Sequence, residues 1–344
     1  MTTPTPAAPG SIPPPHLTPS TSTAPAHAAP ASSSSPPPHS APLDRSEMSG
    51  AEFRSGVEPG TANGRGRGAL CGVVLAAGEG QRLRPLTLSV PKALCPVGNV
   101  ALLDRALARL AGAGLSGPAD VAVNAAYLAG QIVRHVGGRA HLSVEEDGPL
   151  GTSGGLGRLK GWIDGRSVLV GNADAYLADP AREPGKDIAA LLDGWSGETV
   201  RMLTKPVPAG ADGGFSGRRF AGFSLLPWRY VRLLRDEHDE LVRTVWRPAE
   251  AAGELELIGY EGVYIDTGTA ADYLAANLHA TGGRTLVDPT AEITAPVSEA
   301  VIGAHARVHG PVTRAVVWPG AEVQAGESLT DAIRAPGGLT VHAR

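Results

Sequence analysis

The sequence predicts an α/β protein with a mixed, mostly parallel sheet, followed by a short β-solenoid and preceded by a disordered tail. Three observations lead to this prediction. From Ala69 to about residue 282, short apolar runs alternate with amphipathic helical patterns, which is typical of a parallel sheet covered by helices. Apolar residues then recur every fifteen positions. The first 68 residues, in contrast, are almost wholly Pro, Ala, Ser, Thr and Gly.

The N-terminal segment, residues 1–68, contains too few large apolar side chains to offset the entropy lost when a chain is ordered. We therefore expect a solvated, disordered tail. Two alternatives stay open: a proline-rich docking segment for a partner, or translation that begins at Met48. No functional residue is assigned to this segment.

Residues 69–282 are expected to form one domain in which strands and helices follow one another. The expected strands are 71–78, 120–124, 140–146, 167–174, 219–227 and 255–266, and the expected helices are 100–114, 126–138, 154–162 and 270–283. In the first helix, Leu103, Leu107 and Leu110 share one face, and glycines end the pattern. This alternation predicts a layered, Rossmann-like sheet with right-handed crossovers.

Residues 283–344 carry a degenerate repeat with a period of fifteen. The repeat consists of Ala291-x-Ile293, Ala306-x-Val308 and Ala321-x-Val323, and Ile302 and Val317 keep the same step, with Ile333 within one residue of it. Short β repeats of this period predict a solenoid of about three coils, each stacked on the last. An irregular β meander is the alternative.

The composition of the chain argues against several classes of function and location. A net charge of −4 gives no support for a nucleic-acid or anionic-membrane partner. Two cysteines, Cys71 and Cys95, are too few for a disulfide scaffold or a metal-ligand set, so a reducing compartment is expected. The chain also lacks both an apolar run of about 18 residues and a secretory signal pattern. We therefore expect a cytoplasmic protein.

The most informative stretch runs from residue 75 to residue 97. Gly78 and Gly80 follow the first strand, where a glycine-rich turn brings backbone amides close to phosphate oxygens. The turn is neither a dinucleotide fingerprint, since Leu83 replaces the third glycine, nor a P-loop, which needs Gly-Lys-Ser/Thr. Arg82 and Lys92 lie among three prolines that stiffen the loop. Two fixed cations beside such amides suit chemistry that builds negative charge on a phosphate.

This stretch, LAAG-x-G-x-R-L-x-P-L-T-x-x-x-P-K-x-L-x-P-V, resembles the opening of the sugar-1-phosphate nucleotidyltransferases, also called nucleotide-sugar pyrophosphorylases. The resemblance continues through PLGTSGG (149–155), GNAD (171–174), FAGFSLLP (220–227) and YIDTGTAADYLAANL (264–278). Within the family, the chain resembles the mannose-1-phosphate guanylyltransferases and the N-acetylmuramate-1-phosphate uridylyltransferases. The C-terminal segment resembles the left-handed hexapeptide β-helix that is common among relatives.

The resemblance implies a role for each matching residue. Arg82 would contact the departing pyrophosphate, and Lys92 would stabilise charge at the α-phosphate. Gly151 would line the base and ribose, where a side chain would collide. The residues that would bind the nucleotide are Leu75, Ala76, Gly78, Gly80, Gln81, Arg82, Lys92 and Gly151.

The resemblance also implies the sugar and metal contacts. Asn172 would face the sugar, and Lys205 would contact the sugar phosphate, although an exposed loop lysine is the alternative because Thr204-Lys205-Pro206 lacks the family's glutamate. Asp174 and Asp266 would hold Mg²⁺, which prefers one or two carboxylates and takes other ligands from phosphate and water. Each aspartate taken alone is also compatible with a helix cap or turn.

The implied activity is Mg²⁺-dependent transfer of a nucleoside monophosphate from a nucleoside triphosphate to a sugar-1-phosphate. No general base is required, because the attacking phosphate is already ionised near neutral pH. GTP with mannose-1-phosphate is the first expectation, while uridylyl, thymidylyl and adenylyl transfer stay open. Two further alternatives stay open as well: a catalytically inactive regulatory or scaffold homologue, and a homo-oligomer assembled through the C-terminal segment.

Overall fold

The computed structural model describes residues 69–208 and 213–343. The predicted disordered tail, residues 1–68, therefore lies outside the described residues. In the described part of the chain, no helix has both the length and the apolar character needed to cross a membrane.

A seven-stranded mixed sheet lies at the centre of the structure, in the order β10-β8-β9-β6-β1-β4-β5. Strand β9 is antiparallel to both of its neighbours, β6 and β8, and the remaining pairs are parallel. This confirms the predicted mostly parallel, Rossmann-like sheet. The strands are β1 (Leu70–Leu75), β4 (Val121–Ala125), β5 (His141–Val144), β6 (Ser167–Asn172), β8 (Val200–Pro206), β9 (Arg218–Leu226) and β10 (Leu255–Gly259).

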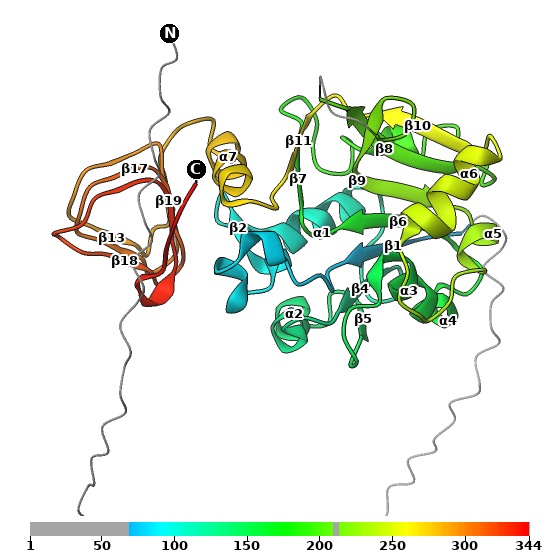
Figure 1. The fold of residues 1–344 in the computed structure, drawn as a ribbon, viewed down its shortest axis with the longest axis horizontal. Helices are drawn as coiled ribbons and strands as arrows, with labels where there is room; N and C mark the ends of the chain where they lie inside the picture. Colours follow the sequence, from blue (N-terminus) through cyan, green and yellow to red (C-terminus); the bar gives the residue numbers. More distant parts are fainter. Residues whose placement is uncertain (1–68, 209–212, 344) are drawn as a thin grey trace, which may run out of the picture. The chain divides into compact units, whose positions relative to one another are not determined.

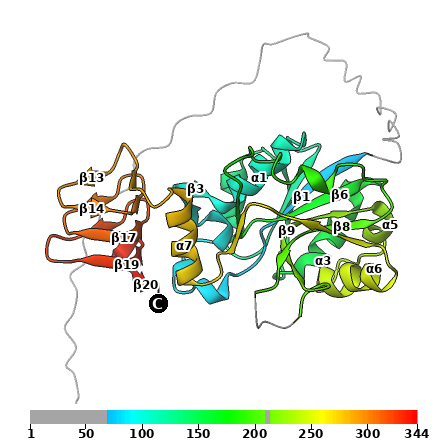
Figure 2. The ribbon, with the colours of Figure 1, turned by 90° about the horizontal axis from the view of Figure 1, so that it is seen from above.

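Helices cover both faces of this sheet (Figure 2) because successive strand residues point to opposite sides. In β1, Val73 and Val74 are both fully buried, but they belong to different apolar clusters. One cluster packs against Leu103 and Leu110, as the predicted helical face requires. The helices of that face are α1 (Leu102–Gly112) and α2 (Ala129–Val136), and those of the other face are α3 (Gly151–Arg158), α4 (Lys160–Ile163) and α6 (Arg247–Ala251).

The predicted single strand 255–266 is wrong, because it is two strands in different sheets. Strand β10 joins the main sheet, whereas β11 (Val263–Asp266) pairs antiparallel with β7 (Ala175–Ala178). The chain turns at Gly262, where a Cβ would lie 2.5 Å from the carbonyl oxygen of Ala178. The sequence also gave no prediction of β7 or β8, of the short ladder β2 (Pro96–Val97) with β3 (Val100–Ala101), or of the π-helical turn Val242–Trp246.

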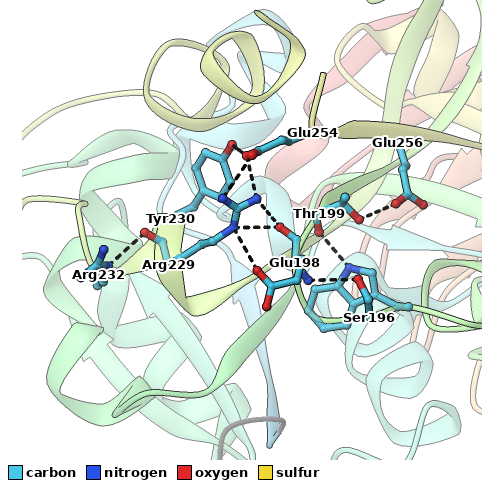
Figure 3. Close-up of polar contacts among 9 residues, drawn as sticks. Ser196, Glu198, Thr199, Arg229, Tyr230, Arg232, Glu254 and Glu256 are labelled. Carbon is cyan, nitrogen blue, oxygen red and sulfur yellow. Dashed lines mark hydrogen bonds and ion pairs between the residues drawn. The ribbon is translucent and has the colours of Figure 1, made fainter. Parts of the chain in front are cut away.

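A polar cluster joins α5 (Trp228–Val231) to the segments that precede β8 and β10 (Figure 3). Arg229 donates to the carboxylate of Glu254 at 2.6 Å and to the carbonyl oxygen of Glu198 at 2.8 Å. The Tyr230 hydroxyl also donates to Glu254, and burial together with this carboxylate raises the pKa of Tyr230 to about 12. The cluster lies at the amino ends of the two strands and holds them in place.

After α7 (Ala270–Ala280), the chain forms stacked parallel coils (Figure 1). Val301 pairs with Val316 and Arg307 pairs with Glu322, both fifteen residues apart, so the predicted repeat is confirmed. The last coil is longer, because Val316 pairs with Ile333. The strands are β12 (Leu286–Val287), β13 (Glu292–Ile293), β14 (Val297–Ser298), β15 (Val301–Ile302), β16 (Arg307–Val308), β17 (Val312–Val317), β18 (Glu322–Val323), β19 (Leu329–Arg334) and β20 (Thr340–His342).

The solenoid core is continuous with the packing around the loop that carries the two predicted cations. Leu83 and Leu86 from this loop are buried in one apolar cluster with Tyr273 of α7 and with the inner side chains of the coils. Trp318 donates its indole N–H to the Tyr273 hydroxyl at 3.0 Å. Asn99 donates to the carbonyl oxygen of Ile302 at 2.9 Å. The cation-bearing loop is thus held from the solenoid side as well as from the sheet.

Candidate active site

A cavity of about 230 Å³ opens at the carboxyl ends of three neighbouring strands, β1, β4 and β6. Leu75 ends β1 and lies opposite Asn124 in β4 and Asn172 in β6. Ligands of open α/β sheets bind at this edge, because loops and helix N-termini meet there. The register therefore brings residues that are almost a hundred positions apart to one end of the sheet.

The glycine-rich loop forms the floor of this cavity. A Cβ at Gly78 would meet nothing within 4 Å, so this glycine faces open space. Gly80 has a left-handed backbone with φ of 61°, and a Cβ there would lie 2.9 Å from the Cβ of Lys92. The first glycine leaves the cavity open to a bulky ligand. The second allows the loop to close onto the lysine.

Four charged side chains converge beside the loop. The ammonium of Lys92 donates to Asp174 Oδ2 at 2.9 Å and to Asp266 Oδ1 at 3.4 Å. The guanidinium of Arg82 donates to the other oxygen of Asp266 at 3.0 Å. The Lys92 side chain is only 5% exposed, whereas the two carboxylates are 46% and 42% exposed. The buried cation thus holds two accessible anions together.

The two aspartates become neighbours through the β7–β11 ladder. Asp266 lies opposite Ala175, the residue that follows Asp174. Thr267 reinforces this pairing, because its hydroxyl donates to the carbonyl oxygen of Asp174 at 2.8 Å. Gly268 comes next, and a Cβ there would overlap the guanidinium of Arg82. The strand pairing places Asp266, and the glycine gives Arg82 room to reach it.

The electrostatics of this cluster favour the ionised forms of Asp266 and Arg82. Burial alone would raise the pKa of Asp266, but the positive charges of Lys92 and Arg82 outweigh it and hold that pKa below its ordinary value. The hydrogen bond to Asp266 correspondingly raises the pKa of Arg82. Burial, followed by the two carboxylates, raises the pKa of the nearby Tyr264. Asp266 is therefore an anion at neutral pH, ready to bind a cation.

The donor set fits Mg²⁺ better than a transition metal. Within the described residues, no group of three or more His, Cys, Asp or Glu side chains is arranged to hold a metal ion. Asp174 and Asp266 supply two accessible carboxylates, and both contact the ammonium of Lys92. An ion that takes its remaining ligands from phosphate oxygens and water needs no more from the protein.

The structure brings most of the predicted site residues together. The predicted residues that line the cavity are Leu75, Ala76, Gly78, Gly80, Lys92, Gly151, Asn172 and Asp174. Arg82 and Asp266 join them through the charged cluster. The side chain of Gln81 instead donates to Glu79 at 2.9 Å.

Lys205 is not brought into the cavity. It lies on β8 rather than in a loop, so the loop alternative is wrong. Its ammonium donates to the carbonyl oxygens of Tyr260 and Gly262 at 3.1 and 3.0 Å. In this position, Lys205 supports the turn between β10 and β11.

Segment 235–241 forms a wall of the cavity that the sequence did not predict. Gly151, Gly154 and Gly157 of α3 follow one another at steps of three, and a Cβ on each would overlap a backbone carbonyl of this segment. The carbonyl of Asp239 also accepts from the backbone N–H of Ser153 at 2.9 Å. The close approach of the Asp239 carbonyl oxygen therefore explains why residue 151 is a glycine. In the sequence, the three-residue spacing of these glycines was the feature that could have indicated a closely packed helix face.

This close packing leads to a prediction about stability. Gly157→Ala should lower the free energy of unfolding by about 1–3 kcal/mol, because its Cβ would overlap the carbonyl of Arg235. Gly161→Ala, in α4, is the matched control: a Cβ there meets nothing within 4 Å, and the change should be neutral or slightly stabilising. Thermal or urea unfolding of both variants measures the difference. Equal midpoints would contradict the packing described for α3.

A second missed feature is a buried hydrogen-bond chain behind the glycine-rich loop. Asn124 accepts from the backbone N–H of Ala76 at 2.7 Å and donates to Glu145 at 2.7 Å. Glu145 also accepts from the backbone N–H of Leu150 at 2.8 Å, and it is only 3% exposed. The chain of contacts fixes the starts of the 76–80 loop and of α3 relative to each other. Its signal was a polar residue at the carboxyl end of each of two predicted strands.

Part of the chain is similar in sequence to known proteins. Residues 71–180 match the family model described as nucleotidyl transferase. A mannose-1-phosphate guanylyltransferase of Mycobacterium tuberculosis is 34% identical over 126 residues, which cover 35% of this chain and 32% of that protein. An N-acetylmuramate alpha-1-phosphate uridylyltransferase of Neisseria meningitidis is 33% identical over 150 residues, 42% of this chain and 63% of that protein. The matched regions thus span less than two thirds of these relatives, 32% of the first and 63% of the second.

A longer sequence match and a solved structure provide two further similarities. A glucose-1-phosphate thymidylyltransferase of Streptomyces antibioticus is 26% identical over 306 residues, 77% of this chain and 80% of that protein. The crystal structure of a putative glucose-1-phosphate thymidylyltransferase from Bacillus anthracis superimposes with a TM-score of 0.50 and 19% identity, covering 62% of this chain and 95% of that one. At this identity the structural match supports the fold alone.

Proposed function

We propose that this chain, like the sugar-1-phosphate nucleotidyltransferases to which it is similar, transfers a nucleoside monophosphate from a nucleoside triphosphate to a sugar-1-phosphate, releasing pyrophosphate. GTP and mannose-1-phosphate are the first substrates to test, and the cytoplasm is the proposed location. The observation that carries the proposal is the convergence of Lys92 and Arg82 on Asp174 and Asp266 beside a glycine-lined cavity.

In the proposed reaction, an oxygen of the sugar phosphate attacks the α-phosphorus, and the bond from that phosphorus to the bridging oxygen of pyrophosphate breaks. Charge builds on the oxygens of the α-phosphate and on the departing pyrophosphate. Lys92, which the loop and Gly80 hold in one position, neutralises the first of these charges. Arg82 neutralises the second. Catalysis then consists of positioning and charge stabilisation, without a proton-accepting side chain.

The carboxylates of Asp174 and Asp266 would hold Mg²⁺, which when bound neutralises phosphate charge and aligns the two reactants. Lys92 keeps the two aspartates close to each other before any ion arrives. Both carboxylates are partly exposed, and Asp174 also lines the cavity. The backbone at Gly78 is equally accessible to phosphate oxygens, since no Cβ covers it.

Pyrophosphate release tests the proposal. The purified full chain is incubated with magnesium, with each of GTP, ATP, CTP, UTP and dTTP, and with a panel of sugar-1-phosphates, and inorganic phosphate is detected after pyrophosphatase is added. Turnover that requires both substrates is expected. Binding of nucleotide or nucleotide sugar without turnover for any pair would instead favour the catalytically inactive homologue.

At acidic pH, the rate of this reaction should depend on protonation of the sugar-phosphate substrate. The sugar phosphate loses its second proton at a pKa near 6, and the dianion is the better nucleophile. Asp266 stays ionised at that pH because its pKa is lowered. We therefore expect kcat/KM for the sugar phosphate to fall as the pH drops below about 6. With a phosphonate analogue whose second pKa differs, the pH at which kcat/KM begins to fall should shift by the same amount. If that pH does not shift, the ionisation belongs to the enzyme and not to the substrate.

A further inference from the structure

We propose that Glu240 reads the base of the nucleoside triphosphate and selects guanine. This inference rests on the proposed function and adds the base that the site accepts. It starts from the wall formed by segment 235–241, which carries His238 and Glu240 to the cavity beside Gly151 and Thr152. The carboxylate of Glu240 accepts from Thr152, whereas the four converging charges contact one another, so Glu240 is not part of the charged cluster.

The two carboxylate oxygens of Glu240 have different surroundings. Oε2 accepts from the hydroxyl of Thr152 at 2.5 Å and from its backbone N–H at 3.2 Å. Oε1 lies over Gly151, 2.9 Å from the point that a Cβ of this glycine would occupy. The side chain is thus fixed through one oxygen, while the other is presented beside a residue without a side chain. If the planar base of a nucleotide lies against Gly151, the hydrogen-bonding groups on the edge of the base would face Oε1.

The segment that carries Glu240 is held in advance of binding. The carbonyl of Asp239 accepts from Ser153, and the backbone N–H of Asp239 donates to the carbonyl of Leu150 at 3.0 Å. The backbone N–H of Leu241 donates to the Thr152 hydroxyl at 2.8 Å. Contacts on both sides of Glu240 therefore hold its backbone against α3. A preorganised acceptor discriminates more strongly than a mobile one, because little order has to be gained on binding.

The chemistry of the bases decides which one such an acceptor favours. A carboxylate only accepts hydrogen bonds. Guanine offers two adjacent donors, the N1–H and the N2 amino group, whereas adenine and cytosine place an unprotonated ring nitrogen beside one amino group. Uracil and thymine place their single N–H between two carbonyl oxygens, which a carboxylate repels. Guanine is the base with two adjacent donors that can both reach the free oxygen Oε1, since Oε2 already accepts from Thr152.

Binding with magnesium present, measured calorimetrically on the full chain, tests this inference. The ligands are GTP, ITP, ATP and UTP; ITP lacks only the N2 amino group of GTP. We expect GTP to bind roughly 10- to 100-fold more tightly than ITP, the range for a hydrogen bond to a charged group. In Glu240→Gln, the amide oxygen is needed by Thr152, so the –NH₂ group faces the base and the preference for GTP over ITP should be lost. Glu237→Gln, on the same segment with a side chain 71% exposed, is the matched control and should keep the preference.

Three outcomes would overturn the inference. GTP binding no tighter than ITP or UTP in the native chain is the first. A uniform loss of affinity for all four nucleotides in Glu240→Gln is the second, since that would make Glu240 an anchor for Thr152 alone. A preference that survives in Glu240→Gln is the third. Because binding is measured without a sugar phosphate, absence of turnover would count against the proposed function and leave this test intact.

Discussion

Replacing Lys92 with methionine is expected to lower kcat about 10²- to 10³-fold, with a much smaller change in KM for the nucleotide. The charge that Lys92 neutralises is larger in the transition state than in the bound substrates, so its loss falls on kcat. Methionine fills the space of the buried lysine stem and keeps the packing against Gly80. Steady-state kinetics with saturating magnesium measure the effect.

Lys160→Met is the matched control for this substitution. The ammonium of Lys160 donates to the carbonyl oxygens of Arg232 and Leu234. Those contacts lie outside the cavity, so kcat should be unchanged. Lys92→Arg should not restore activity, because a planar guanidinium does not fit where a compact ammonium contacts two carboxylates. An unchanged kcat in a folded Lys92→Met protein would contradict the role proposed for this residue.

Asp266→Asn is expected to raise the magnesium concentration needed for half-maximal velocity by roughly tenfold or more, since an amide oxygen is a weaker ligand for this ion than a carboxylate. The protein should stay folded, because the Asp266 side chain is 42% exposed and the β7–β11 ladder is made by backbone atoms. Initial rates across a magnesium titration, at fixed concentrations of both substrates, measure the shift.

Asp331→Asn provides the control for Asp266→Asn. Asp331 pairs with Arg314 on the surface of the solenoid, and both side chains are 47% exposed. Loss of this surface pair should cost little stability and leave the magnesium titration unchanged. If Asp266→Asn and the native chain show the same titration, Asp266 is not a magnesium ligand.

Much of the fold could be predicted from the sequence, because its signals are local. The apolar run of β1, the Leu103–Leu110 face of α1 and the fifteen-residue step from Ile302 to Val317 are each visible within a short stretch of chain. The same holds for the 75–97 loop, in which glycines, prolines and two cations follow one another. Such patterns depend on backbone conformation and on burial of one face, which neighbouring residues specify together.

Contacts between distant segments escaped prediction. The strand 255–266 was expected to be continuous because its apolar pattern is continuous, yet Gly262 lets β11 leave the main sheet to pair with β7. Lys205 looked like a loop residue because nothing near it in sequence shows that Val200–Pro206 is an inner strand, paired with β9 and β10. In both cases the partner strand decides, and it lies elsewhere in the chain.

By itself, the sequence determined that a stiff loop with Arg82 and Lys92 follows the first strand, and that Asp174 follows a later one. Only the tertiary structure decided that Lys92 lies between Asp174 and Asp266, which are 82 and 174 positions away, and that Glu240 faces the same cavity. The physical reason is that helix and strand periods are properties of consecutive residues, whereas a site is made by sheet register and by close backbone contacts across the fold.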